Sequence, residues 1–286
     1  MKSTMIIDFS SYLHASFHVA RYDKDISSTE ERNQYWKSLL VGMILNVKKL
    51  YKPDEVILAI DSPNSHRKLS FKYYKARRIL KKEDSDIDFD EFNRVSNIFL
   101  DEIKTNLPVK VVKTAQTEAD DIIGILTSKL REHDITIVSR DKDFTQLLKF
   151  PNVKIHNPMD NKLIVCDNPH EFLVLHILGG DSGDDVPNIL SPDDIFVTTG
   201  KRQKSITKGI IKEVLEDGLD KFVIKNNLIA NYERNRNLVE LSEEIIPQDL
   251  QTEIMYAYNN AKVKADFEDM VGYLARNNFT NLINNL

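Results

Sequence analysis

Acidic residues in this chain cluster beside apolar segments, at a spacing that could bind metal ions. The stretch EADDIIGILTSKL places Glu118, Asp120 and Asp121 directly before an apolar run. Acids at the start of a helix are ordinary, because they complement the helix dipole. Taken alone, these residues favour a capped helix, with Thr117 as the N-cap and Asp120 at the third helical position.

Further acids follow other apolar segments of strand length. One such acid is most often a turn residue. In an open parallel sheet, however, the carboxyl ends of the strands meet at one edge, where ligands bind. Carboxylates gathered there without a cation would raise one another's pKa and oppose folding. The acids at the ends of the segments, and in the turn GGDSGDD, are Asp8, Asp61, Asp141, Asp143, Asp181, Asp184 and Asp185.

The chemistry of these ligands favours magnesium. They offer oxygen atoms only, and their motifs contain neither Cys nor His. Such sites suit Mg²⁺, for which Mn²⁺ can substitute. Two ions about 4 Å apart can activate a water and stabilise a leaving oxygen in phosphodiester cleavage.

A basic stretch follows Asp61 by only a few residues. No acid occurs between Ser62 and Lys82, and the cations of HRKLSFKYYKARRILKK alternate with aromatic residues. A helix of this kind could follow phosphates while its aromatic rings stack on unpaired bases. The alternative is a solvated helix face that packs through Leu69 and Tyr73. Its position next to the acidic edge favours a polyanionic substrate.

The elements that must position these residues alternate between strands and helices. This alternation predicts an α/β fold with a mostly parallel sheet and helices on both faces. Beyond Gly179–Gly180 clear strands disappear. We expect an α/β domain over residues 1–180 and a smaller, all-helical portion over residues 181–286. The expected strands are 4–9, 55–61, 109–113, 135–139, 152–157 and 162–167, and the expected helices are 31–52, 89–107, 117–134, 205–223 and 247–263.

Composition excludes several classes of protein. The apolar fraction of 41% suffices for a core, but no apolar run reaches the length of about 20 residues that spans a bilayer. The first residues are too polar for a secretion signal, and the single Cys166 excludes an internal disulfide. We therefore expect a cytoplasmic protein without a membrane partner.

Taken together, the chain resembles the 5′-nuclease superfamily of flap endonucleases and 5′→3′ exonucleases. The likeness is strongest to its branch of T-even phage ribonucleases H, which remove RNA primers. It covers residues 5 to about 190, and the run from SRDKDF to NPM is its most specific part. The matching stretches, in the order of the family, are IIDFS, LAID, FKYYKARR, EADD, SRDKDFTQLLKFPNVKIHNPM and ILGGDSGDDVPN.

The resemblance implies a role for each matching residue. Lys75 and Arg78 would grip the scissile phosphate from a helical arch at about residues 64–92, and Tyr74 would stack on a base. Two Mg²⁺ ions would be the cofactor. The first ion would be held or surrounded by Asp8, Asp61, Glu118, Asp120 and Asp121, and the second by Asp141, Asp143, Asp181 and Asp184. Where the family often has Asn, this chain has Asp185, so Asp184 is the better candidate of the two.

The resemblance also implies nucleic-acid contacts outside the metal site. The segment after Pro187 corresponds to a helix–three-turn–helix that binds duplex backbone. The compact Gly-Ile-Gly hairpin of the family is replaced here by the longer SPDDIFVTTGKRQKSITKG. The expected nucleic-acid contacts are Arg67, Lys68, Lys72, Tyr74, Lys75, Arg78, Lys201, Arg202, Lys204 and Lys208.

The implied function is hydrolysis near the 5′ end of RNA–DNA hybrids and of nicked or flapped DNA, by a monomer that removes RNA primers during phage replication in the host cytoplasm. A single-strand-binding protein and a sliding clamp would be its partners. A PIN-type ribonuclease and a non-catalytic, structure-specific nucleic-acid-binding protein are the alternatives. An aspartyl phosphatase is disfavoured, because Asp8 is followed by Phe9 and Ser10 rather than by the Asp-x-Asp motif.

Overall fold

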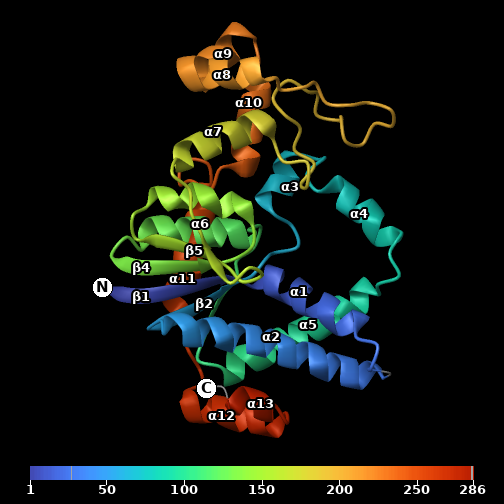
Figure 1. The fold of residues 1–286 in the computed structure, drawn as a ribbon, viewed down its shortest axis with the longest axis vertical. Coiled ribbons are helices and arrows are strands. Elements are labelled where there is room, and N and C mark those ends of the chain that lie inside the picture. The colour runs from blue at the N-terminus through green and yellow to red at the C-terminus, as the bar shows by residue number, and fades with distance from the viewer. Residues whose placement is uncertain (27, 285) are drawn as a thin grey trace.

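The structure is a computed structural model that describes residues 1–26, 28–284 and 286. A six-stranded sheet forms its centre (Figure 1). The first five strands run parallel, and β6 pairs antiparallel with β5. The mostly parallel sheet predicted from the sequence is therefore confirmed. In spatial order the strands are β3 (Lys110–Val112), β2 (Glu55–Ala59), β1 (Lys2–Asp8), β4 (His133–Val138), β5 (Val153–Asn157) and β6 (Lys162–Ile164).

The central strands are buried on both faces, which explains their nearly unbroken apolar sequence. In β1, Met5 and Ile7 belong to one core and Ile6 to the other, and all three are fully buried. Helices α1 (Phe9–Tyr22), α2 (Thr29–Tyr51) and α5 (Phe89–Asn106) contribute to the first core, whereas α6 (Ala119–Lys129) and the 3₁₀ helix η1 (Lys142–Lys149) contribute to the second.

The last helices of the chain complete these two cores. Helix α11 (Gln248–Asn260) packs on α6 and β3, and α12 (Phe267–Arg276) packs on α5 and is followed by α13 (Thr280–Ile283). Leu250 and Ile254 of α11 are buried in the second core, and Met270 and Leu274 of α12 in the first. The helical character of the C-terminal portion is confirmed, whereas its separation as a domain at residue 180 stays a prediction.

A third core joins the C-terminal helices to the basic stretch. It contains residues of α7 (Pro169–Gly179), α8 (Lys208–Asp217), α9 (Leu219–Lys225) and α10 (Ile229–Val239), together with Phe71 and Tyr74. Figure 1 shows α8 and α9 at one end of the molecule and α12 and α13 at the other. The helix expected over residues 205–223 is divided, because it ends at Gly218 and restarts as α9.

The arch segment, residues 64–92, does not contain the single basic helix suggested by the spacing of its lysines. Helix α3 (His66–Ser70) ends before Phe71, and α4 (Ala76–Glu83) begins after Lys75. The backbone of Lys75 has a positive φ of 56°, which breaks the helix between the two. Beyond α4, Asp86 pairs with Arg21 of α1 at 2.6 Å.

Two helices of the structure, α7 and α10, have weak signals in the sequence. The residues of α7 are apolar on most sides, so they show little helical periodicity. Helix α10 is short and rich in Asn and Arg. Neither helix is among those expected from the sequence, whereas the segment 190–204 was expected to be a loop and contains neither helix nor strand in the structure. No helix of the described residues is long and apolar enough to cross a membrane.

Two neighbouring glycines at the end of α7 give a test of the turn that carries Asp181. Gly180 has φ 66° and ψ −168°, and a Cβ there would overlap the carbonyl oxygens of Val186 and Pro187. We predict that Gly180→Ala lowers the free energy of unfolding by at least about 2 kcal/mol, since this conformation is nearly restricted to glycine. Urea unfolding would measure it.

Gly179→Ala is the matched control. A Cβ at Gly179 meets no atom within 4 Å, so this variant should unfold at the wild-type urea concentration or slightly above it. Equal midpoints for the two variants would contradict the role assigned to Gly180.

Candidate metal centre and active site

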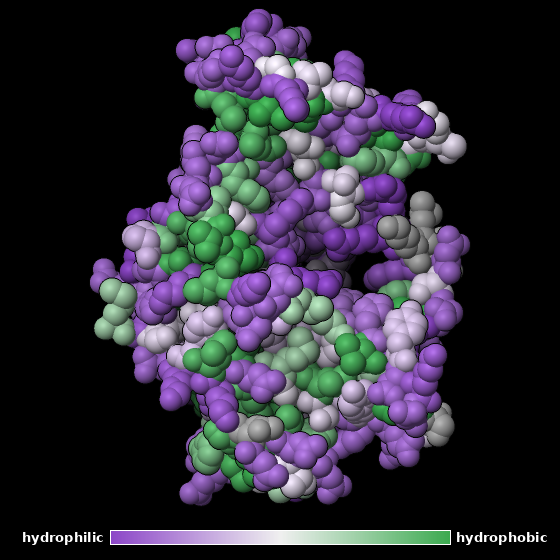
Figure 2. Space-filling model, in the orientation of Figure 1, coloured by the Kyte–Doolittle hydropathy of each residue, from purple (hydrophilic) through white to green (hydrophobic). Residues whose placement is uncertain are grey.

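One cavity of about 820 Å³ opens at the carboxyl ends of the central strands. The strand order reverses between β1 and β4, and open α/β sheets bind ligands at this switch point. Figure 2 shows an opening in the surface here, bordered mainly by hydrophilic residues. Eight carboxylates line the cavity: Asp8, Asp61, Glu118, Asp120, Asp141, Asp143, Asp181 and Asp184.

The first acids are held by hydrogen bonds at the ends of strands. Asp8 ends β1 and caps α1, where its carboxylate accepts from the Ser11 N–H at 3.1 Å and from the Ser139 hydroxyl at 2.9 Å. Asp61 follows β2 and accepts from the Ala119 N–H, at the start of α6, at 2.7 Å. Helix capping and a place in the cavity therefore coexist in the same side chains.

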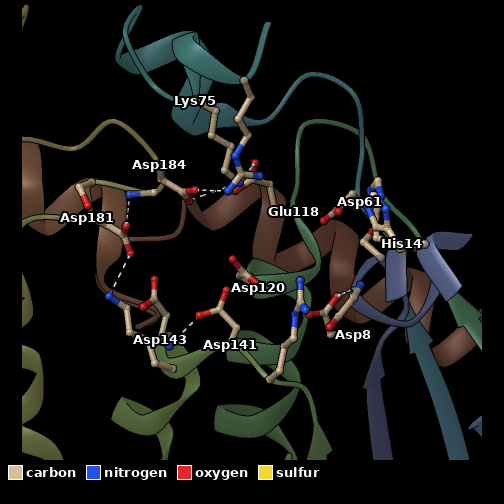
Figure 3. Close-up of a pocket in the computed structure, with 18 residues that line it drawn as sticks. Asp8, His14, Asp61, Lys75, Glu118, Asp120, Asp141, Asp143, Asp181 and Asp184 are labelled. Carbon is tan, nitrogen blue, oxygen red and sulfur yellow. Dashed lines mark hydrogen bonds and ion pairs between the residues drawn. The ribbon is translucent and has the colours of Figure 1, made fainter. Parts of the chain in front are cut away.

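The acids of the stretch EADD have two different environments. The N-cap of α6 is Glu118, not Thr117 as expected, and the Glu118 N–H donates to Asp121 Oδ2 at 2.9 Å. This reciprocal contact turns Asp121 into the protein, where its side chain is fully buried. Asp120 instead faces the cavity (Figure 3). Glu118 and Asp120 thus line the cavity, whereas Asp121 does not, and its place around a metal ion stays a prediction.

Arg67 neutralises the buried Asp121. Its Nη2 lies 2.7 Å from Asp121 Oδ1, and its Nη1 lies 3.6 Å from Glu118 Oε2. Arg67 is only 1% exposed, so it does not lie on the surface where the expected contact with nucleic acid would form, and that contact stays a prediction. Burial and the neighbouring charges act against each other on Asp121: burial raises its pKa, but Arg67 and His66 outweigh burial and keep the pKa below its ordinary value.

Tyr74 is a second residue that the sequence placed on the surface. The side chain is buried, and its hydroxyl lies 2.8 Å from Glu118 Oε2 and 3.1 Å from Asp184 Oδ2. In this position the ring does not reach the surface, and its stacking on a base stays a prediction. Its hydroxyl instead fixes two of the acids that line the cavity.

Lys75 and Arg78 of the arch segment do line the acidic cavity. Figure 3 shows Lys75 directed toward Asp184 and Glu118. The ammonium of Lys75 donates to Glu118 Oε1 at 2.8 Å and lies 3.5 Å from Asp184 Oδ2, and Arg78 pairs with Asp184. The Lys75 N–H also donates to the Asp184 carbonyl at 2.8 Å, which holds the strained backbone of Lys75. Asp185 is buried and pairs with Arg77, consistent with the preference for Asp184.

The other basic residues expected to contact nucleic acid lie outside this cavity. Lys68 and Lys72 are exposed on the arch segment, and the remaining four are exposed before and at the start of α8. Lys201 pairs with Asp194 at 2.9 Å. Contacts of these residues with nucleic acid stay predictions. The four residues near α8 are Lys201, Arg202, Lys204 and Lys208.

The pKa values of the acids follow from how each charge is compensated. Burial, with the charge of Asp61 next, raises the pKa of Asp8 to about 6. Burial and Asp141 raise the pKa of Asp120 well above its ordinary value, and burial and Asp143 raise that of Asp141. Burial opposes ionisation of Glu118 too, but Lys75 and Arg67 outweigh it and lower the pKa.

The donor atoms fit a divalent cation. Three carboxylates with raised pKa values face one cavity without a fixed cation strong enough to offset their burial. Hard cations with oxygen ligands supply the missing positive charge.

A histidine that the sequence did not indicate adjoins this site. His176 Nε2 lies 3.2 Å from Asp143 Oδ1, although the acidic motifs contain no histidine. Ligand atoms of Asp143, His176 and Asp181 lie within 4.8 Å of one another. His176 lies on α7, five residues before Asp181 in the following turn, but no spacing rule connects it with Asp143 of η1.

Substitution of Asp8 tests whether burial and repulsion among the carboxylates of the cavity destabilise the fold. A carboxyl whose pKa rises from 3.8 to about 6 on folding destabilises the fold as pH increases through this interval, and its full cost applies above pH 6. In EDTA at pH 7.5, Asp8→Asn should therefore raise the free energy of unfolding, by up to about 3 kcal/mol. The amide can still cap α1.

Thermal melts of both proteins in EDTA between pH 4 and 8 measure this difference. The gap between variant and wild type should nearly vanish at pH 4, where the carboxyl is protonated. A wild type that is more stable than the variant at pH 7.5 would show that repulsion is not the dominant cost at Asp8.

Comparisons with known proteins agree with this geometry. Residues 3–172 match the 5′–3′ exonuclease N-terminal, resolvase-like domain, and residues 169–286 match the C-terminal domain of T4 RNase H. Ribonuclease H of Enterobacteria phage T4 is 32% identical over 239 residues, which cover 79% of this chain and 77% of that protein.

Solved structures share the fold. A T5 protein co-crystallised with metal ions superposes with a TM-score of 0.67 at 19% identity, over 91% of this chain and 100% of the other. A complex of the bacteriophage T5 flap endonuclease with DNA and metal ions gives 0.66 at 18% identity, over 90% and 98% of the two chains. The resemblance seen in the sequence motifs is thus confirmed: the chain belongs to the 5′–3′ exonuclease family and carries a C-terminal domain of the T4 ribonuclease H type.

Proposed function

We propose that this protein is a Mg²⁺-dependent 5′→3′ nuclease that hydrolyses phosphodiester bonds near the 5′ end of RNA–DNA hybrids and of nicked or flapped duplex DNA. The observation that carries the proposal is the convergence of eight carboxylates on one cavity, with Lys75 and Arg78 beside them. Support comes from the T4 relative, which is a ribonuclease H, and from the T5 flap endonuclease, which binds DNA and metal ions. Removal of RNA primers in phage replication is the proposed role.

Two groups of acids would hold two Mg²⁺ ions, for which Mn²⁺ can substitute. When bound, such ions lower the pKa of a water and stabilise the charge of the leaving oxygen. One group would be Asp8, Asp61, Glu118 and Asp120, and the other Asp141, Asp143, Asp181 and Asp184.

The cations of the arch segment would bind the substrate phosphate. Lys75 and Arg78 now pair with Glu118 and Asp184, at the rim where the arch segment meets the acids. A phosphate placed there would accept the same donors, and the ion pairs keep both side chains directed at it beforehand. The exposed Lys68 and Lys72 would bind neighbouring phosphates and add affinity without chemistry.

The helical portion would bind duplex DNA. We propose that residues 1–180 form the nuclease domain with its arch and residues 181–286 the DNA-binding portion, as a monomer in the host cytoplasm if the protein is phage-encoded. Thr207 caps α8 by accepting from the Ile210 N–H, and the start of this helix is suited to a phosphate. A single-strand-binding protein and a sliding clamp are the proposed protein partners. The duplex contacts would be Lys201, Arg202, Lys204 and Lys208.

Cleavage of a 5′-flapped duplex and of an RNA–DNA hybrid tests the function. We expect cleavage in Mg²⁺, none in EDTA, and restoration by added Mg²⁺. Asp141→Asn should suppress cleavage by at least about 10²-fold while binding of the duplex persists, because the variant removes a ligand but adds no positive charge. If the wild-type protein binds the duplex without cleaving it, the result would favour the non-catalytic nucleic-acid-binding protein. If it cleaves only single-stranded RNA, the result would favour the PIN-type ribonuclease.

Lys75 and Lys72 form a matched pair on the arch segment. Lys75 contacts Glu118 and lines the cavity, whereas Lys72 is exposed and stacks on the Tyr73 ring at 4.7 Å. At saturating protein, Lys75→Ala should slow single-turnover cleavage by about 10²-fold, as expected for loss of one charged group at the reacting phosphate. Lys72→Ala should leave this rate unchanged and weaken binding modestly, in a salt-dependent manner. Equal single-turnover rates for the Lys75 variant and the wild type would remove Lys75 from the reaction.

A further inference from the structure

His176 lies behind the acids of the cavity and has no role in the site proposed above. It stands near the end of α7, and its side chain is only 6% exposed. Three elements bring the group together: Asp143 lies in the first turn of η1, His176 in the last turn of α7, and Asp181 in the turn that follows α7. Figure 3 shows Asp143 and Asp181 on the same side of the cavity.

The facing atoms of His176 and Asp143 are both buried and unsatisfied. Nε2 and Oδ1 lie 3.2 Å apart, which is a hydrogen-bond distance, but their directions do not fit a hydrogen bond. Among the described residues, neither atom has another hydrogen-bond partner. Leaving a buried polar atom unpaired destabilises a fold, so two such atoms side by side indicate a third group between them.

A divalent cation fits this arrangement. Bonds from nitrogen or oxygen to a small divalent ion are about 2.1 Å long, and two ligands in adjacent positions then lie about 3 Å apart. The separation of Nε2 and Oδ1 agrees with this geometry. A hydrogen bond would need the ring N–H to point at the oxygen, whereas coordination needs both lone pairs to point at a common centre.

Asp181, the third ligand, is positioned by a hydrogen bond within its own turn. Asp181 Oδ1 accepts from the Gly183 N–H at 2.6 Å, while Oδ2 meets only the exposed Lys142 at 3.6 Å among the described residues. The ring of His176 packs on Phe172, one helical turn earlier, with centroids 5.8 Å apart. Both side chains are therefore fixed by neighbours that leave one ligand atom available.

We propose that His176 is a nitrogen ligand of the second metal ion, together with Asp143 and Asp181. The inference rests on the two-metal centre of the proposed function. An imidazole nitrogen suits Mn²⁺, Fe²⁺, Co²⁺ or Zn²⁺ better than Mg²⁺, which prefers oxygen. The two metal positions are then chemically unequal: oxygen ligands alone surround the one near Asp8 and Asp61, and the one at His176 selects a transition-metal ion.

Electron-spin-echo spectroscopy of bound Mn²⁺ tests this inference without any measurement of activity. Full-length protein would receive Mn²⁺ up to two equivalents, so that both metal positions are filled. We expect modulation from a directly bound ¹⁴N nucleus in the wild type, replaced by the ¹⁵N pattern when histidine is labelled. Because this measurement uses the unmutated protein, it does not depend on the folding of a variant. Bound Mn²⁺ without nitrogen modulation would overturn the inference.

Two variants identify which histidine supplies the bound nitrogen. His176→Gln, checked for folding by circular dichroism, should lose the modulation and bind Mn²⁺ at least about tenfold more weakly by calorimetry, with a smaller change for Mg²⁺. His14→Gln is the matched control, because His14 lines the same cavity beside the other group of acids. It should keep the modulation, and loss of the signal in this variant instead would overturn the assignment.

The two proposals fail in distinguishable ways. A protein that cleaves a flapped duplex in Mg²⁺ but shows no nitrogen at its Mn²⁺ ion refutes the role of His176 and leaves the nuclease function standing. A protein that binds Mn²⁺ through His176 but never cleaves refutes the nuclease function and leaves the metal ligand standing.

Discussion

Negative charge concentrated at one edge of the sheet is the constraint on which the rest of this structure depends. The cavity is lined by eight carboxylates but by only four cationic side chains, Lys75, Arg78, Arg140 and Lys142. The fold tolerates the excess by raising the pKa values of Asp8, Asp120 and Asp141, at a cost in stability near neutral pH. A polyanion would be repelled from such a cavity, so cations from solution must enter before or together with the substrate. In the proposed nuclease, metal binding would then favour substrate binding as well as chemistry.

Near the cavity, buried ion pairs hold the base of the arch segment, residues 67–78. Farther along the segment the ion pair is exposed. At the base, the buried Arg67 neutralises Asp121, and Arg77 neutralises the buried Asp185. Removing one partner of such a pair leaves an uncompensated charge inside the protein, so the base behaves as an extension of α6 and of the Asp181 turn. At the far end, Arg21 pairs with Asp86, whose side chain is 89% exposed, and salt screens such a contact. The ion pairs that hold the arch segment therefore weaken with distance from the acids.

The sequence predicts the strands and most of the cavity because both follow from local rules. Strand-length apolar runs that end in acids place Asp8, Asp61 and Asp141 at one edge as soon as the sheet is parallel. The differences between sequence and structure come from burial, which depends on tertiary packing. Arg67 and Tyr74 look like surface residues within a basic stretch, yet the C-terminal helices cover that part of the chain. A shift of the helix cap by one residue sends Asp121 inward and Asp120 outward, and capping propensity cannot distinguish neighbouring acids at that precision. His176 leaves no signal, because its neighbour Asp143 is distant in the sequence.

The packing of α11 and α12 on both faces of the sheet also has a consequence for synthesis of the protein on the ribosome. The apolar faces of β1, β2 and β4 remain incompletely covered until residues near 274 have been made, since Leu250, Ile254, Met270 and Leu274 belong to the same two cores. Contacts of such long sequence separation form late and slow the folding reaction. A nascent chain that carries all the cavity acids therefore still lacks a finished core, and it exposes apolar surface that chaperones recognise. Assembly of a competent cavity is in this way delayed until α12 has been translated, and chains terminated before α12 would lack part of the first core.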